Sequence, residues 1–159
     1  MITLVPMTDE EYKNFLHVSI KEYAQDHVKD GKWTADEAIE RSAEEFRSLL
    51  PDGIHTAGHY LCSIQHDVLG IVGVLWYAIS AKGNKETAFI YDVRVYDEFQ
   101  GQGFGTEALQ ALEGTLRAKD VSSIGLHVFG HNQRAFNLYV RLGYIATNIR
   151  MSKELSEER

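Results

Sequence analysis

Near the start of the chain, apolar residues return every three or four positions, which is the period of a helix with one buried face. This pattern predicts a helix over residues 10–30 that ends near the Asp30-Gly31 pair. A second helix is expected over residues 34–50, because Thr34 can cap it and Glu37 completes a capping box. Its buried face is expected to carry Ile39, Ala43, Phe46 and Leu50.

The middle and end of the chain show the two-residue alternation of strands, interrupted twice by helical periods. The expected strands are residues 2–7, 59–66, 68–79, 86–96, 122–130 and 144–153, and the two later helices are residues 103–119 and 132–143. Only Asp67 separates the second and third strands, which favours a hairpin. A run of strands followed by two strand–helix units is typical of one domain on a mixed sheet, here residues 1–159.

Composition narrows the class of protein. The 159 residues fit one domain, and 44% of them are apolar, which is ordinary for a globular protein. No apolar run reaches the ~18 residues of a membrane span, and the first residues lack a signal-peptide pattern, so no membrane partner is expected. The net charge of −7 argues against a nucleic-acid partner held through its phosphates. The single cysteine, Cys62, excludes an internal disulfide and favours a cytoplasmic location.

The stretch QGQGFGTEAL (residues 100–109) carries three glycines at alternate positions, Gly101, Gly103 and Gly105. It falls between an expected strand and an expected helix, where free backbone N–H groups and the positive end of the helix face outward. Glycine lets a backbone close around an anion such as a phosphate, because a Cβ would stand in the way. The spacing fits neither the dinucleotide-binding fingerprint nor a P-loop. From the residues alone, phosphate binding and a tightly packed turn are both open interpretations.

Two further stretches accompany these glycines. The spacing Gln100-x-x-Gly103-x-Gly105 is preceded by DVRV (residues 92–95) and followed, about thirty residues on, by HNQRAFNLYVRLGY (residues 131–144). Together they resemble the GNAT superfamily of N-acetyltransferases, and in particular its small bacterial members. The order of expected elements also follows that family over most of the chain. The resemblance implies an α/β (α+β) fold: one GNAT-like domain with a mixed, mostly antiparallel twisted sheet of six to seven strands and about four flanking helices.

The resemblance further implies acetyl-CoA as the cosubstrate and indicates which residues bind it. The pantetheine arm would pair with the backbone of Val93, Arg94 and Val95 in the manner of an added strand. The pyrophosphate would lie in the glycine loop, which comprises Gln100, Gly101, Gln102, Gly103, Phe104, Gly105 and Thr106. Asn132 would contact the pantetheine portion, although an asparagine at this position is also an ordinary helix cap.

Tyr139 and Asp92 are the candidate catalytic residues. Tyr139 corresponds to the general acid with which the family protonates the departing CoA thiolate, and it shares a helix face with Asn132, seven residues earlier. Its alternative role is that of a packed aromatic. Asp92 is the side-chain candidate for the base that takes the amine proton; the alternative is a water chain, with Asp92 merely bonded to a neighbour. Because strand side chains alternate, Tyr91 is expected on the opposite face from Asp92.

The expected function is transfer of an acetyl group from acetyl-CoA to a primary amine by direct attack within a ternary complex. The acceptor would be a small-molecule or peptide amine, selected by the two N-terminal helices, and no metal-ligand spacing is present. A non-catalytic acyl-CoA-binding or sensing module is the alternative, since it would need the glycine loop but not Tyr139. An interaction scaffold would need neither. Dimers are frequent in the family, so a homodimer is compatible with the resemblance.

Overall fold

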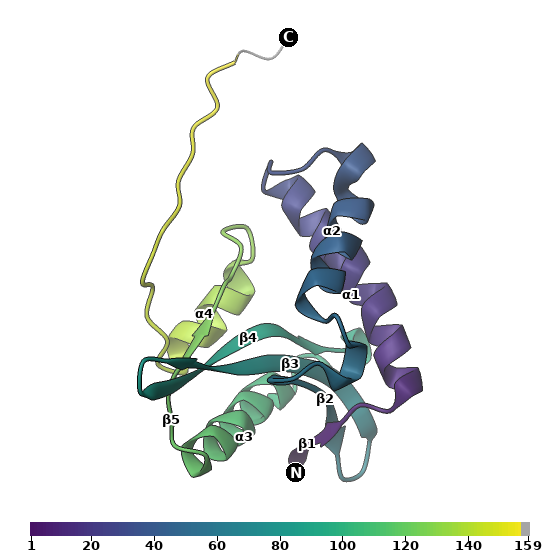
Figure 1. Cartoon of the computed structure of the whole chain (residues 1–159), viewed down its shortest axis with the longest axis vertical. Coiled ribbons are helices and arrows are strands. Elements are labelled where there is room, and N and C mark those ends of the chain that lie inside the picture. Colours follow the sequence, from purple (N-terminus) through teal and green to yellow (C-terminus); the bar gives the residue numbers. More distant parts are fainter. Residues whose placement is uncertain (157–159) are drawn as a thin grey trace.

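A sheet of five strands organises the computed structural model, which describes residues 1–156 (Figure 1). The strands are β1 (Ile2–Pro6), β2 (His59–His66), β3 (Gly70–Lys82), β4 (Lys85–Val95) and β5 (Val121–Leu126). The helices are α1 (Asp9–Lys29), α2 (Ala35–Leu49), α3 (Phe104–Ala118) and α4 (Gln133–Arg141), with short 3-10 turns at Gly53–His55 and Asp97–Phe99. The strands stand in sequence order across the sheet; β1 to β4 are antiparallel neighbours, and β5 runs parallel to β4.

Capping boxes fix where the first two helices begin. The Thr8 side chain accepts a hydrogen bond from the Glu11 amide, and Glu11 Oε1 accepts one from the Thr8 amide. Thr34 and Glu37 form the same arrangement at the start of α2, as predicted. Each box satisfies backbone donors that the first turn of a helix leaves free, so both starting points are set by local sequence.

The buried face of α2 agrees only in part with the one predicted, since Phe46 and Leu50 are buried as expected but Ile39 is not. Ala38, Ser42 and Phe46 are buried, whereas Ile39 is 52% exposed. The Ser42 hydroxyl donates a 2.7 Å hydrogen bond to the Ile20 carbonyl of α1, so a small polar side chain lies at the helix–helix contact. The prediction followed apolar residues only, so it included Ile39 and omitted Ser42. A serine can be buried when its hydroxyl has a hydrogen-bond partner, and apolar periodicity does not detect this.

The sheet separates two apolar cores. On one face, α3 packs Leu109 and Leu112 against strand residues such as Leu75. On the other face, α1 and α2 cover Trp76, whose ring meets that of Phe15 edge-on with centroids 5.9 Å apart. Figure 1 shows α3 below the sheet and the α1–α2 pair rising above it. None of the helices within residues 1–156 combines the length and the apolar character needed to cross a membrane.

The sheet is narrower than the six to seven strands predicted. The expected last strand, residues 144–153, pairs with no other strand in the described part of the chain, and β5 ends at Leu126 rather than continuing to residue 130. The alternating pattern of residues 144–153 is real, but a strand forms only where a neighbouring edge is within reach. The α/β class with four helices is as predicted.

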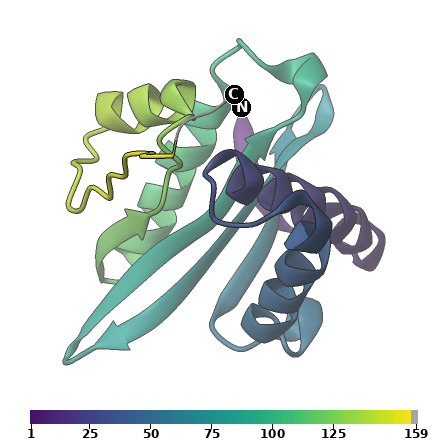
Figure 2. The ribbon, with the colours of Figure 1, turned by 90° about the horizontal axis from the view of Figure 1, so that it is seen from above.

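β4 and β5 pair over only part of their length, and their divergence creates the functional part of the fold. β4 pairs with β5 from Glu86 to Ile90, where the partner of Ile90 is Leu126 at the end of β5. Beyond Ile90, β4 keeps its pairing with β3 on one side, and no strand within residues 1–156 pairs with its other side. Residues 91–95 of β4 therefore present a free backbone edge, and in Figure 2 the α1–α2 pair and α4 lie on either side of this part of β4.

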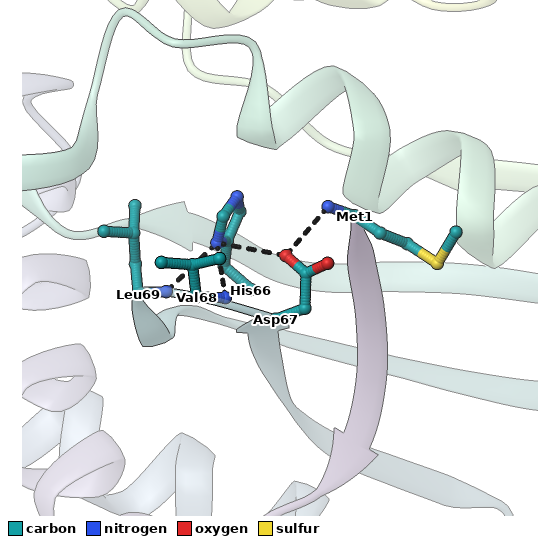
Figure 3. A network of polar contacts seen from close by, with 5 residues as sticks. All are labelled: Met1, His66, Asp67, Val68 and Leu69. Carbon is teal, nitrogen blue, oxygen red and sulfur yellow. Dashed lines mark hydrogen bonds and ion pairs between the residues drawn. The ribbon is translucent and has the colours of Figure 1, made fainter.

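The turn between β2 and β3 is tied to the N-terminus and to α3. His66 Nδ1 accepts hydrogen bonds of 3.1 Å from the amides of Val68 and Leu69, and the N-terminal amine lies 3.1 Å from Asp67 Oδ1 (Figure 3). The His66 ring also packs against Phe104, with ring centroids 5.0 Å apart. This contact holds the first turn of α3 against the sheet, next to the glycine loop.

Candidate functional site

The glycine loop presents an uncapped helix terminus. Gly101 and Gly103 have φ values of +81° and +84°, in the left-handed region that glycine adopts readily. Gly103 is the N-cap of α3, and no side chain among residues 1–156 bonds to the first turn in its place. A Cβ at either glycine would have no atom within 4 Å, so these glycines serve the backbone conformation rather than tight packing. The free N–H groups of the first turn face open space, which suits an anion.

A cavity of about 600 Å³ lies in front of this loop, between the end of β4, the start of α3 and one side of α4. Every predicted cofactor residue except Gln102 lines it, and so does Tyr139, but Asp92 does not. The cavity follows the free edge of β4, so the backbone groups of residues 93–95, apart from the Val95 carbonyl that accepts from Gln100, are available to an extended ligand on that side. The structure thus brings together residues that lie about forty positions apart in the sequence.

Several of these residues contribute backbone rather than side chain. The Phe104 side chain is buried in the core, and Gln100 Nε2 donates to the Val95 carbonyl oxygen at 2.9 Å, which braces the loop against the end of β4. Asn132 Oδ1 accepts a 3.2 Å hydrogen bond from the Ala135 amide, so its role as the cap of α4 is confirmed. Asn132 also lies in the cavity wall, so its place as the cap is compatible with the predicted contact to the pantetheine portion.

Two arginines that sequence reasoning missed also line the cavity. Arg134 and Arg141 lie seven residues apart on α4, the same spacing as Asn132 and Tyr139. Arg134 Nη1 donates a 3.3 Å hydrogen bond to Gln100 Oε1 and so joins α4 to the glycine loop. Guanidinium groups next to an uncapped helix terminus strengthen its suitability for phosphate. The seven-residue spacing was the available signal in the sequence.

A β-bulge in β4 changes which side chains face α1. Trp76 of β3 pairs with Asp92, but the next residue, Tyr77, pairs with Ile90, so Tyr91 is an extra residue without a partner. Tyr91 stacks on the Trp76 ring with centroids 4.5 Å apart, on the sheet face that α1 and α2 cover. Asp92 also bonds to α1, as described next. The prediction that Tyr91 and Asp92 face opposite ways is therefore wrong, because the bulge interrupts the strand alternation.

Asp92 lies in a buried polar network on the α1 side of β4. The Ser19 hydroxyl donates to Asp92 Oδ2 at 3.0 Å, and Arg94 Nη2 donates to the same Ser19 oxygen at 3.0 Å. Arg94 Nε lies 3.6 Å from Glu22 Oε1. Burial raises the pKa of Asp92, against the opposing effects of Arg94 and of the Ser19 hydrogen bond. Asp92 is thus bonded to a neighbour, and its raised pKa also makes it a stronger proton acceptor than a free carboxylate.

Tyr139 lies on the cavity side of β4, opposite this network. Burial raises the pKa of Tyr139 to about 12, with smaller contributions from the charges of Asp92 and Tyr144. The hydroxyl is therefore protonated at neutral pH and able to donate.

The loop before α4 and helix α1 meet above the α1 side of β4. Phe129 of the loop packs edge-on against His27 with centroids 5.1 Å apart. His131 Nε2 lies 3.0 Å from Asp26 Oδ1, so a polar contact crosses between two segments 105 residues apart. No sequence pattern indicated this contact. The carboxylates of Glu22 and Asp26 both lie on the α1 side of β4, which faces away from the cavity.

A profile of the acetyltransferase (GNAT) family matches residues 21–144. The chain belongs to the GNAT family. The match includes β4, the glycine loop and α4, which together form the cavity. The family assignment agrees with the resemblance inferred from Gln100-x-x-Gly103-x-Gly105 and the α4 stretch.

Similar GNAT proteins occur in Bacillus subtilis (strain 168). The chain is 38% identical to the uncharacterized N-acetyltransferase YycN over 97% of this chain and 99% of that protein. The crystal structure of YycN superimposes with a TM-score of 0.94 over 99% of this chain and 100% of that chain. Identity to the uncharacterized N-acetyltransferase YdgE is 37% over 96% of this chain and 98% of that protein. The mycothiol acetyltransferase of Rhodococcus opacus (strain B4) is 29% identical over 74% of this chain and 37% of its own length.

Proposed function

We propose that the chain is an N-acetyltransferase that transfers the acetyl group of acetyl-CoA to a primary amine by direct attack in a ternary complex. The proposal rests on one observation: the uncapped start of α3, the free edge of β4 and the Tyr139 side chain all line the same cavity. This arrangement suits a ligand with a phosphate group at one end, an extended amide-bearing arm and a thioester at the other end.

The cofactor side of the site binds and orients acetyl-CoA in this proposal. First-turn amides of α3 hold the pyrophosphate, and Arg134 and Arg141 supply positive charge beside it. Backbone groups of residues 93–95 pair with the pantetheine arm, as a strand would. The thioester then reaches the part of β4 that Tyr139 and Asp92 flank.

Bond changes follow from these positions. The amine nitrogen attacks the thioester carbonyl carbon, a C–N bond forms and the C–S bond breaks. Asp92, directly or through water, takes the proton that the amine loses, and a backbone N–H near Val93 stabilises the developing oxyanion. The Tyr139 hydroxyl donates a proton to the departing sulfur, and solvent returns a proton to the tyrosine. The products are the N-acetylated amine and the free thiol of CoA.

The acceptor enters from the α1 side in this scheme, because Asp92 and the cofactor cavity lie on different sides of β4. Glu22 and Asp26 on α1 favour an amine that arrives as a cation. This cation gives one proton to solvent before attack, and Asp92 takes the second proton as the C–N bond forms. A small-molecule amine and a peptide amine both satisfy this chemistry.

Calorimetric titration with acetyl-CoA tests the cofactor half of the proposal, with two glycine variants of the same helix. Gly105→Glu puts a carboxylate in the cavity wall, where a Cβ would be in ordinary contact with Leu138 and Val95, each 3.8 Å away. Gly114→Glu adds the same group farther along α3, where nothing lies within 4 Å. We expect wild type and Gly114→Glu to bind alike, and Gly105→Glu to lose at least tenfold, about 1.4 kcal/mol. Equal binding by all three proteins would contradict the proposal that the start of α3 binds the pyrophosphate.

A thiol-release assay tests the transfer itself. Polyamines, amino acids, aminoglycosides and peptides would each be offered with acetyl-CoA, and the released thiol would be compared with the acetylated product by mass spectrometry. Equal amounts of thiol and acetylamine are expected for the true acceptor. Tight binding of acetyl-CoA without transfer to any amine would instead favour the non-catalytic acyl-CoA-binding module.

A further inference from the structure

Two aromatic side chains of β4 are exposed beside Asp92. Phe89 and Tyr91, here called the aromatic patch, are 37% and 38% exposed, and their rings meet edge-on with centroids 4.8 Å apart. Both lie on the sheet face opposite α3, because Ala88 and Ile90, the neighbours of Phe89, point into the α3 core. A single exposed aromatic residue is ordinary, but two in contact next to a candidate catalytic group indicate a binding surface.

The bulge in β4 fixes the position of Tyr91 in this patch. Tyr91 has no partner on β3, and its ring stacks on Trp76 with an angle of 20° between the two planes. Trp76 is itself held in place, since it is buried and its Nε1 donates a 3.0 Å hydrogen bond to His59 Nδ1. Bulges are frequent next to active sites, where they redirect a side chain. Tyr91 therefore offers a fixed apolar surface immediately before Asp92 in the chain.

The groups on the α1 side of Asp92 are mainly acidic. Glu22 and Asp26 are four residues apart on α1 and so share a face of the helix. Glu22 Oε1 lies 3.6 Å from Arg94 Nε, and Asp26 Oδ1 lies 3.0 Å from His131 Nε2. With Asp92, three carboxylates thus stand against the guanidinium of Arg94 and the ring of His131. This balance suits a ligand that carries a positive charge next to the aromatic patch.

We propose that the acceptor is a primary amine that carries an aromatic ring, with its nitrogen at Asp92 and its ring on the aromatic patch. This inference rests on the proposed acetyltransferase function and names the class of amine. Because consecutive Cα atoms are ~3.8 Å apart, a link of about two carbons between nitrogen and ring suits the step from Asp92 to Tyr91. Contact with Tyr91 and Phe89 removes the apolar surface of the ring from water and adds ring–ring interactions.

A second ammonium group fits the aromatic patch less well than a ring does. Residues 89–91 are Phe-Ile-Tyr, so this part of β4 supplies no carboxylate to pair with a cation. A cation placed there would give up hydration without an anionic partner, and a cation–π contact recovers only part of that loss. The patch therefore favours an aromatic amine over an aliphatic polyamine.

The first test compares phenethylamine with n-butylamine as acceptors at saturating acetyl-CoA. Wild type should use phenethylamine with a kcat/KM about tenfold higher or more. Tyr91→Ala and Phe89→Ala should each raise the KM for phenethylamine but not that for n-butylamine, which has no ring to lose contact. A variant with a damaged fold would instead impair both amines alike.

Tyr60→Ala is the matched control for these variants. Tyr60 is 36% exposed and stacks on Tyr77 with centroids 4.8 Å apart, on the sheet face that α3 covers. Its substitution removes an exposed ring of the same kind from the opposite face of the sheet, so the kinetics with both amines should match wild type. Acetyl-CoA binding and circular dichroism check that each variant is folded.

The second test measures binding without turnover. Phenethylamine is titrated by calorimetry into protein saturated with CoA, which has no acetyl group to transfer. Wild type and Tyr60→Ala should bind it alike, and Tyr91→Ala should bind it about tenfold more weakly.

The outcomes separate the acceptor class from the proposed function. Equal or better use of n-butylamine or spermidine by wild type, or phenethylamine binding that Tyr91→Ala leaves unchanged, would overturn the aromatic acceptor while acetyl transfer stands. Absence of transfer to every amine would overturn the proposed function, and the calorimetric titration would still decide whether the aromatic patch binds an aromatic amine.

Discussion

The Ser19 hydroxyl of α1 donates a 3.0 Å hydrogen bond to the Asp92 carboxylate of β4, across 73 residues of sequence. This bond fixes the Asp92 side chain on the α1 side of the strand, while Tyr139 lies on the cavity side. Because burial raises the pKa of Asp92, the carboxylate accepts a proton more readily than a surface aspartate does. In the proposed transfer, Asp92 therefore accepts the proton of the amine, and Tyr139 donates a proton to the departing sulfur.

Asp92→Asn should lower kcat about a hundredfold, because the amide cannot accept the amine proton. In wild type, the rate should rise with pH through the raised pKa of Asp92, and the variant should lack this limb. Glu40→Gln is the control, since it removes an exposed carboxylate of α2 that lies outside the Asp92 network. The measurement is a pH–rate profile with one acceptor. Unchanged turnover in Asp92→Asn would mean that water alone takes the proton.

The same substitution should change stability in a pH-dependent way. With its pKa raised on folding, Asp92 favours the folded state at pH values below its ordinary pKa, and this contribution is lost as pH rises through the raised value. At pH 7 the buried carboxylate therefore costs stability. Asp92→Asn should raise the melting temperature at pH 7 and change it less at pH 4. A difference in melting temperature that does not vary with pH would contradict this linkage.

Tyr139→Phe should lower kcat by about 10²–10³ with little change in the Kd for acetyl-CoA, because the ring remains and only the proton donor is lost. Tyr144→Phe serves as control: its ring packs against Tyr139 with centroids 5.6 Å apart, but it lines a second cavity, next to β5. Since burial raises the pKa of Tyr139 to about 12, no loss of rate from its ionisation is expected up to pH 10. Equal rates for wild type and Tyr139→Phe would leave Tyr139 as a packed aromatic.

Features set by local sequence were predictable. The predicted capping box at Thr34 and the predicted glycine turn before α3 both depend on residues within a few positions of one another. The bulge in β4 was not predictable, because it depends on the register in which β3 and β4 pair. Trp76 pairs with Asp92, but the next residue of β3 pairs with Ile90. The same holds for the contact of His131 with Asp26, which depends on how distant segments pack.

The last predicted strand failed for a different reason. Residues 144–153 carry a strand pattern, yet whether such a segment pairs depends on the edge that it can reach, and that edge is a property of the assembled sheet. In α2, Ser42 rather than Ile39 marks the buried face, because a hydrogen bond to the Ile20 carbonyl compensates the hydroxyl. Hydrophobic periodicity carries no information about such partners.

Gly73→Ala should destabilise the fold by at least about 2 kcal/mol, since overpacking a core forces backbone shifts. A Cβ at Gly73 would stand 2.2 Å from the Arg94 carbonyl oxygen, on the strand that borders the cavity. Gly114→Ala is the control: it lies in α3 with no atom within 4 Å, and alanine there should be neutral or stabilising by up to ~1 kcal/mol. Urea unfolding measures both. Equal urea midpoints for Gly73→Ala and wild type would contradict this prediction, because they would mean that β3 and β4 can move apart at Gly73 without a loss of stability.

His27→Phe should make the protein less sensitive to acid. The His27 ring is 5% exposed and lies against Trp33, with centroids 4.2 Å apart, and against Tyr23 and Phe129. Neither ring nitrogen has a hydrogen-bond partner within residues 1–156, and burial lowers the pKa of His27.

The sign follows from that direction. A group whose pKa falls on folding contributes stability above its ordinary pKa of 6.5, and this stability is lost as pH drops through the lowered value. The melting temperature should therefore fall between pH 7 and pH 5 by at least about 2 °C more in wild type than in His27→Phe. His17→Phe, on the exposed side of the same helix, should follow wild type. If His27→Phe and wild type respond equally to acid, the ring gains a proton without leaving its aromatic surroundings, and the packing of Phe129 against α1 does not depend on a neutral His27.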